Sequence, residues 1–327
     1  MKKYLVGIFA VLLALSLFSC SASPTAIKVG NNKVDASEYA YYLNYNRLNL
    51  DALAAGTTVL NMDQLMEQAR QAARQQIVSA EIVRIKCDEL GLELTKEQKK
   101  EMKDEKDELI DSFGGLSGYL DYLRENALTD RLYDKLQENS YYYSMLHDYI
   151  AADPDIGVNN DQQLRQFFSE NYTKVRYIRF SSLDEDGSLM DSDSLDALLE
   201  QAQEVLRQIN DGELTFDQAG AEYGDGAGLE GTVIGTQDAS QAEYVSDAFS
   251  LIDGQTGGVY TYSDGYYILQ RQAVDISYFD ENREQIELAA SDWAFNSYIS
   301  AAESNINVTE SGVCQKIDFS NISDYIK

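Results

Sequence analysis

Two runs of alternating polar and apolar residues constrain the fold of this 327-residue chain most strongly. They are Val175–Phe180 and Gly265–Gln270. Period-two alternation of Val, Ile, Tyr and Phe is typical of β-strands. Amphipathic helical patterns and a Gly-rich loop lie between the two runs. The segment Lys174–Arg271 therefore predicts a small mixed sheet wrapped by helices.

The composition indicates a folded, strongly acidic protein with more than one domain. The chain is 44% hydrophobic, which is enough for substantial cores, and its formal net charge is −29. Such a surface argues against binding to nucleic acid and against adhesion to anionic lipid. It would keep the chain soluble beside aggregation-prone partners, although ordinary surface acidity explains it equally well.

The N-terminus carries a targeting signal. Lys2 and Lys3 precede an apolar run, Tyr4–Leu17, which is too short for a stable transmembrane helix but has the length of a signal peptide. The run ends in Leu-Phe-Ser-Cys20, which resembles a lipobox. We therefore expect residues 1–20 to be a lipoprotein signal peptide, with cleavage before Cys20 and anchoring in a lipid bilayer through the acylated Cys20.

Helical patterns fill most of the chain before the first alternating run. Ala26–Val34 predicts a short hairpin, and Met62–Leu90 predicts a long helix with one apolar stripe. Thr95 and Gln98 form a candidate capping box for the charged helix that follows. Further helices are expected up to residue 172.

Five motifs in order over the segment 173–275 carry a family resemblance. They are Val175-Arg-Tyr-Ile178, Asn210-Asp-Gly-Glu-Leu-Thr-Phe216 with Ala219–Tyr223, Tyr244-Val-Ser-Asp-Ala-Phe249, Gly254-Gln-Thr-Gly-Gly-Val259 and Asp264-Gly-Tyr-Tyr-Ile268. The segment resembles a parvulin-type peptidyl-prolyl isomerase domain, and with its flanks the whole chain resembles the extracytoplasmic PrsA/SurA-type foldases.

The resemblance implies an α+β fold in which a mainly helical, discontinuous chaperone domain carries an inserted β-α-α-α-β-β domain. Residues 21–172 would form the N-terminal SurA/PrsA-like part, and residues 276–327 a C-terminal helix and strand that pack back on it. We expect the strand at Val313–Phe319 and the helix at Asp280–Asn305, on which four residues are roughly in phase: Ile286, Ala290, Trp293 and Tyr298. The sequence by itself equally allows three separate units in a row.

The resemblance also implies a site, in which the two usual histidines are replaced. Carried over position by position, the catalytic and substrate-binding positions fall on seven residues. The catalytic positions are Tyr177, Asp225 and Tyr267, and the substrate-binding positions are Tyr244, Phe249, Tyr262 and Asp264. Tyr177 and Tyr267 stand at the two histidine positions. The strand order of the family makes their strands neighbours, so we expect the two side chains to lie side by side and to point toward Asp225.

The chemistry of prolyl isomerisation needs no nucleophile, because the enzyme only has to stabilise the twisted amide. No cofactor or metal is expected, and the single histidine excludes a His-based triad. A neutral phenol can replace part of a hydrogen-bond network or merely fill space. We expect a lipid-anchored foldase or chaperone that binds folding exported polypeptides and their X-Pro segments, with weak or absent isomerase activity. A fully active prolyl isomerase and a scaffold lipoprotein with one fixed envelope partner are the alternatives.

The implied location is extracytoplasmic, at the outer face of a bacterial cell membrane. The Gram type of the envelope and the oligomeric state stay open. Cys87 and Cys314 lie in a chain expected to be exported, so they could form a disulfide or remain two buried thiols.

Overall fold

The structure, a computed structural model, describes residues 23–54, 62–184, 186–224, 226, 228–240 and 243–326. The expected signal peptide with Cys20 lies outside the described residues, and so does Asp225. The fold class is α+β, as expected.

The chain divides into two compact units, and the first of them is discontinuous. It comprises the described residues up to Ile150 and those from Phe295 onward. Its elements are β1 (Thr25–Val29), β2 (Asn32–Asp35), α2 (Ala36–Ala54), α3 (Met62–Leu90), α4 (Lys96–Ser112), α5 (Leu116–Glu125), α6 (Asp130–Ala152), the end of α12 (Arg283–Glu303), β7 (Val308–Glu310), α13 (Gly312–Lys316) and η2 (Ile322–Tyr325).

The first unit contains a three-stranded antiparallel sheet that joins the two ends of the chain. Its order is β2-β1-β7, and Val29 pairs with both Asn32 and Val308. The expected hairpin is confirmed, and its turn places Gly30 at φ 57°, a conformation that favours glycine. The expected final strand at Val313–Phe319 is wrong: the strand lies earlier, at β7, and α13 occupies most of the predicted segment.

Helices α2, α3 and α6 build the core of the first unit around one buried stripe. The stripe on α3 includes Leu65, Ala69, Ala73, Ile77 and Cys87, as the three- and four-residue spacing predicts. The capping box at the start of α4 is also confirmed, because the Thr95 hydroxyl accepts from the Gln98 backbone N–H.

The second unit, Ala151–Ala294, is a four-stranded antiparallel sheet with helices on both faces. The strands lie in the order β4-β3-β6-β5. The short edge strand β4 was not expected from the sequence. The elements are α7 (Asp161–Asn171), β3 (Tyr172–Ser181), α8 (Ser192–Asn210), α9 (Phe216–Tyr223), β4 (Thr232–Gly235), η1 (Thr236–Ser240), α10 (Val245–Ser250), β5 (Thr256–Tyr262), β6 (Gly265–Gln272), α11 (Ile276–Glu281) and the start of α12.

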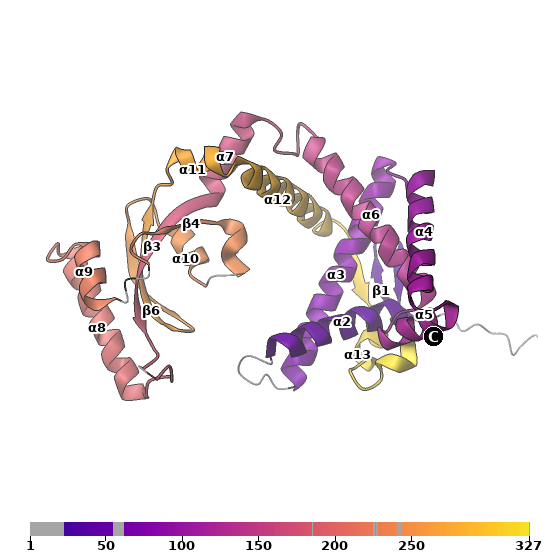
Figure 1. Cartoon of the computed structure of the whole chain (residues 1–327), viewed down its shortest axis with the longest axis horizontal. Coiled ribbons are helices and arrows are strands. Elements are labelled where there is room, and N and C mark those ends of the chain that lie inside the picture. The colour runs from indigo at the N-terminus through magenta and orange to yellow at the C-terminus, as the bar shows by residue number, and fades with distance from the viewer. Residues whose placement is uncertain are drawn as a thin grey trace, which may run out of the picture. The chain divides into compact units, whose positions relative to one another are not determined.

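The two faces of this sheet bury different side chains, because successive residues of a strand point to opposite sides. Helices α8 and α9 cover one face and α10 lies on the other (Figure 1). Ile178 and Ile268 point to the α8 face, whereas Val175, Tyr267 and Leu269 point to the α10 face.

A third cluster ties the flanking helices into the second unit. Phe167 and Phe168 of α7 pack with Phe279 of α11 and Ile286 of α12. The compact unit therefore runs from 151 to 294, wider than the segment 173–275 expected from the motifs. Of the α12 residues expected in phase, Ile286 and Ala290 are buried, whereas Trp293 is 46% exposed. Its neighbours Ala294 and Phe295 are buried instead.

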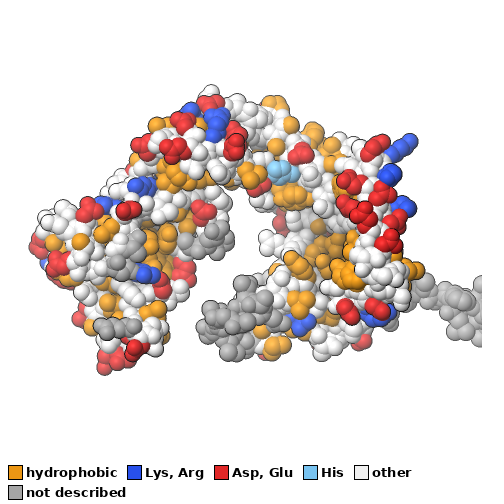
Figure 2. Space-filling view, viewed as in Figure 1, with side chains coloured by type: hydrophobic (Ala, Val, Ile, Leu, Met, Phe, Trp, Pro, Cys, Tyr) orange, Lys and Arg blue, Asp and Glu red, His pale blue; other side chains and the backbone are white. Residues whose placement is uncertain are grey.

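The surface of the protein is acidic, as its composition predicts. Acidic side chains outnumber basic ones over the visible face, in keeping with the net charge (Figure 2). No helix in the described part of the chain has the length and apolarity needed to cross a bilayer.

Cys87 and Cys314 are separate, buried thiols, which donate to the carbonyls of Tyr142 and Ala26.

Candidate functional site

The centre of the α10 face is occupied by the two tyrosines that stand at the expected histidine positions. On the paired strands β3 and β6, Tyr177 lies opposite Leu269 and Arg179 opposite Tyr267. Tyr177 and Tyr267 are thus diagonal neighbours on one face. Their ring centroids are 5.1 Å apart. The expectation that they lie side by side on adjacent strands is confirmed.

Three more tyrosines extend this pair into a continuous aromatic surface. Tyr244, just before α10, lies 5.5 Å from the Tyr177 ring centroid, and Tyr262 of β5 lies 5.1 Å from that of Tyr267. Tyr260 stacks on Tyr262 at 6.2 Å. Tyr267 is only 6% exposed, and the other four rings are half-buried. We call these five residues the tyrosine cluster.

Carboxylates hold two hydroxyls of the tyrosine cluster. The Tyr267 hydroxyl lies 3.0 Å from both carboxylate oxygens of Asp264, which also accepts from Arg179 at 2.9 Å. The Tyr262 hydroxyl donates to Asp247 at 2.7 Å. Burial, reinforced by the neighbouring carboxylate, raises the pKa of both phenols above the usual value of 10. Both hydroxyls are therefore protonated donors at neutral pH.

Tyr177 is held by the loop that follows α9. Its backbone N–H donates to the Gly228 carbonyl at 3.1 Å. A Cβ at Gly228 would clash with the Tyr177 ring, so the loop can approach this closely only with glycine there. Asp225 belongs to the same loop, but the expected contact between the phenols and its carboxylate falls outside the described residues.

The structure brings together most of the expected site residues. Tyr177, Tyr267, Tyr244, Tyr262 and Asp264 form one connected group. Phe249 packs on the same face, but its ring lies beneath the Arg271 guanidinium, 5.7 Å from the centroid.

Sequence reasoning missed Arg179, Asp247 and Tyr260. Arg179 follows Tyr177 by two residues, so the strand period alone places both side chains on one face. Tyr260 and Tyr262 are related in the same way. Asp247 had no such signal, because its contact depends on how α10 packs against β5.

The chemistry of this group suits binding better than bond breaking. The hydroxyls of Tyr262 and Tyr267 are protonated and already bonded to carboxylates, so they offer no strong base or nucleophile. Within the described residues, no group of three or more His, Cys, Asp or Glu side chains could hold a metal ion. Aromatic walls with a few fixed polar groups are typical of surfaces that hold peptide segments.

The first unit also has a tyrosine-rich surface, separate from the tyrosine cluster of the second unit. It is a pocket of about 750 Å³ between α2, α3 and α6. Its lining contains phenols, amides and hydroxyls but no charged side chain. It is formed by Tyr41, Tyr42, Tyr45, Ala72, Gln75, Gln76, Ser79, Ala80, Val83, Leu136, Asn139, Ser140 and Tyr143. Such a lining can accept an uncharged, partly apolar segment.

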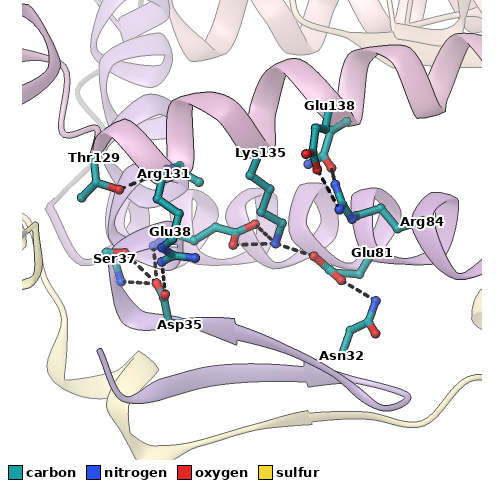
Figure 3. Close-up of polar contacts among 12 residues, drawn as sticks. Asn32, Asp35, Ser37, Glu38, Glu81, Arg84, Thr129, Arg131, Lys135 and Glu138 are labelled. Atoms are coloured by element: carbon teal, nitrogen blue, oxygen red, sulfur yellow. Dashed lines mark hydrogen bonds and ion pairs between the residues drawn. The ribbon is translucent and has the colours of Figure 1, made fainter. Parts of the chain in front are cut away.

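A buried ion network clamps the three helices that frame this pocket. Lys135 of α6 donates to both carboxylate oxygens of Glu38 at 2.8 and 2.7 Å and to Glu81 at 2.6 Å (Figure 3). Asn32 donates to the second oxygen of Glu81 at 2.8 Å. Glu38 and Glu81 are only 2% and 3% exposed. Burial raises the pKa of Glu38, although the positive charge of Lys135 opposes that effect.

One family model matches the N-terminal region of the chain. Residues 3–122 match the family model for the SurA-like N-terminal domain, which confirms the expected SurA-like character of this region. No curated protein sequence matches the chain.

Several solved structures are similar to parts of the chain. The peptidylprolyl isomerase PrsA of Bacillus anthracis is 14% identical, with 72% of this chain and 98% of that chain covered and a TM-score of 0.37. Foldase protein PrsA of Streptococcus pneumoniae is 18% identical, covering 80% and 96% with a TM-score of 0.29. A SurA-like chaperone structure from Campylobacter jejuni is 11% identical, covering 88% and 100% with a TM-score of 0.30. At these TM-scores the similarities establish no common function.

Proposed function

Because residues 3–122 match the SurA-like N-terminal domain, we propose that this protein is an extracytoplasmic foldase-type chaperone. It is attached through acylated Cys20 to the outer face of a bacterial membrane, where it holds exported polypeptides while they fold. Residues 173–275 serve as a parvulin-like domain that binds client segments. The family match of the first unit is the observation that carries this proposal.

Two surfaces support the proposal, one in each unit. The tyrosine-lined pocket of the first unit is uncharged and large enough for several side chains of an unfolded segment. The tyrosine cluster of the second unit offers aromatic faces beside hydroxyls fixed by Asp247 and Asp264. Binding to such surfaces shields apolar side chains from one another and thereby slows aggregation.

Isomerisation by the second unit is weak or absent in this proposal. The two positions that the resemblance assigns to histidine hold Tyr177 and Tyr267, and the Tyr267 hydroxyl is already bonded to Asp264. A hydroxyl in that bond cannot follow the amide as it twists, so little stabilisation of the transition state is left. A fully active isomerase is the alternative, and a proline-peptide assay on the wild-type protein distinguishes the two.

The chaperone proposal is tested by aggregation of a denatured model protein, followed by light scattering. The chain from Ser21 onward should slow aggregation, and Tyr45→Ser should weaken this effect because Tyr45 lines the pocket while 46% exposed. Tyr149→Ser is the matched control: Tyr149 is 39% exposed on α6 but does not line the pocket. Wild-type protein without effect on aggregation would contradict the proposed function, and equal effects of the two variants would contradict the role of the pocket.

A further inference from the structure

Strand β5 forms an open edge of the sheet in the second unit. It lies outermost in the order β4-β3-β6-β5 and pairs only with β6. Among the described residues, no backbone group of Thr256–Tyr262 has a hydrogen bond other than those of the ladder with β6. Along the regular part of this ladder, every second residue therefore turns its N–H and C=O outward, where they meet no partner among the described residues.

The register shows which residues present these groups. Tyr262 and Gly265 close the turn between the two strands, so they form a hydrogen-bonded pair. Such pairs alternate along an antiparallel ladder, which makes Tyr260 and Tyr267 the next one. The N–H and C=O groups of Val259 and Thr261 then point outward.

The usual protections of an edge strand are missing from most of β5. Native edges commonly carry a charged residue, a proline or a bulge that discourages pairing with another chain. The seven residues Thr256–Tyr262 include no proline and no charged side chain. The register shift between Thr256 and Val259 affects only the first half of the strand. Val259–Tyr262 is a regular edge.

Side chains beside this edge indicate what would bind. Tyr260 and Tyr262 present stacked rings on the face of the tyrosine cluster. Glu243 and Asp247 lie at the end of the strand, where they accept from the Ser263 N–H and the Tyr262 hydroxyl. Neither carboxylate has an ion-pair partner among the described residues. The edge therefore combines backbone pairing, an aromatic face and negative charge at one end.

We propose that the β5 edge captures an extended polypeptide segment as an added antiparallel strand. Alternate side chains of the segment lie along Tyr260 and Tyr262, as cross-strand neighbours do. In the antiparallel sense the N-terminal end of the segment lies near Glu243 and Asp247, so a Lys or Arg there is favoured. This inference rests on the proposed function and gives it a binding mode: uncharged β-prone segments preceded by a basic residue.

The test uses three fluorescent peptides and the chain from Ser21 onward. The first peptide has two lysines followed by alternating valine and threonine, and the second has two glutamates in place of the lysines. The third is the first with alternate backbone nitrogens methylated, which removes the N–H groups on one edge of the peptide. Fluorescence anisotropy at low salt should give measurable binding of the first peptide. The third should bind roughly tenfold more weakly, since each lost hydrogen bond lowers affinity by about three- to tenfold. The second should also bind more weakly, because its glutamates are repelled by Glu243 and Asp247.

The protein variants separate backbone from side chain. Thr261→Pro removes one outward N–H and should weaken binding of the lysine peptide by about three- to tenfold. Thr261→Val alters the same exposed side chain but keeps the N–H, and should bind within about twofold of wild type. Circular dichroism identifies any loss of folding in the proline variant. The methylated peptide tests the same hydrogen bonds on unaltered protein.

Two results would overturn the inference. One is equal binding of the methylated and unmethylated peptides to wild-type protein. The other is a concentration-dependent dimer that Thr261→Pro abolishes, with no binding of peptide, because a second copy of the chain would then occupy the edge. Failure here is distinguishable from failure of the chaperone proposal. Suppose that Thr261→Pro slows aggregation as well as wild type does, and that the methylated and unmethylated peptides bind equally. The chaperone function then stands, and the β5 edge has no part in it.

Discussion

Replacing Lys135 with methionine should destabilise the first unit strongly at neutral pH. Lys135 uses all three of its ammonium hydrogens, two on Glu38 and one on Glu81. Methionine keeps the volume of the stem but leaves two carboxylates buried with no cation between them. Glu38 belongs to α2 and Glu81 to α3, so the substitution also removes the ionic contacts that join these two helices to α6.

The expected loss in the free energy of unfolding follows from the burial of the two carboxylates. Removing one partner of a buried ion pair lowers the free energy of unfolding by about 3–5 kcal/mol, since the remaining charge stays desolvated. Glu38 and Glu81 are 2% and 3% exposed, which places this site in that class. Asn32 satisfies one oxygen of Glu81 and does not compensate the charge. We expect a loss at the upper part of this range.

The loss should shrink as the pH falls. The folded-state pKa of Glu38 is already raised by burial, and removal of the opposing positive charge of Lys135 raises it further. A carboxyl with a raised folded pKa favours the folded state below its unfolded pKa, about 4.5, and this contribution is lost as the pH rises through the folded pKa. Protonation of Glu38 below neutral pH therefore restores part of the stability of the Lys135→Met variant.

The assay is urea unfolding followed by far-UV circular dichroism at pH 7 and pH 5. Fluorescence of Trp293, the only tryptophan, reports the second unit and should change much less. Lys106→Met is the matched control: both lysine side chains are 18% exposed, but Lys106 pairs with the solvent-exposed Asp130 and Asp134, so we expect at most about 1 kcal/mol. Equal losses in the two variants, or a loss for Lys135→Met that grows at pH 5, would refute the reasoning.

Three further predictions concern the anchor, the tyrosine cluster and the unit boundaries. Cys20→Ala should leave uncleaved precursor or released protein in cell fractionation, whereas mature protein that still requires detergent would contradict lipidation. Gly228→Ala should destabilise the second unit by about 1–3 kcal/mol in denaturant unfolding, because the added methyl group meets the Tyr177 ring; an unchanged midpoint would show that the loop yields freely. The fragment Ala151–Ala294 should unfold cooperatively and Thr173–Asp275 should not, since only the longer one keeps the α7, α11 and α12 cluster; two equally cooperative fragments would argue against these boundaries.

Elements with a long periodic signal could be predicted from the sequence. The stripe of α3 repeats over 29 residues, and its apolar positions are buried because a helix of that length has one face toward the core. The pair Tyr177 and Tyr267 was predicted from two sources: the regular alternation gives the face of each strand, and the strand order of the resembled family makes the two strands neighbours. In these cases the local pattern and the tertiary packing require the same structure.

The positions of short elements could not be predicted, because they carry no long periodic signal. Val313–Phe319 has strand-forming residues, but β1 offers its free edge to Val308–Glu310 instead. β4 has only four residues and gains its structure by pairing with β3. Asp247 contacts Tyr262 through the packing of α10, which leaves no periodic trace. For these segments the decisive contacts lie far away in the sequence.

The strand pairing of β1 with β7 has a consequence for the order in which the protein is made. Ala26 accepts from the Ser311 N–H at 2.8 Å, and the Arg70 guanidinium donates to the Ile317 carbonyl at 2.8 Å. The strand β1 therefore finds its partner β7 only after the whole of Ala151–Ala294 has been synthesised. Because closing so long a loop is slow, the contiguous unit should fold first on a nascent chain. A chain that terminates before β7 lacks the third strand of its first sheet, so synthesis through β7 is a condition for that unit to complete its fold.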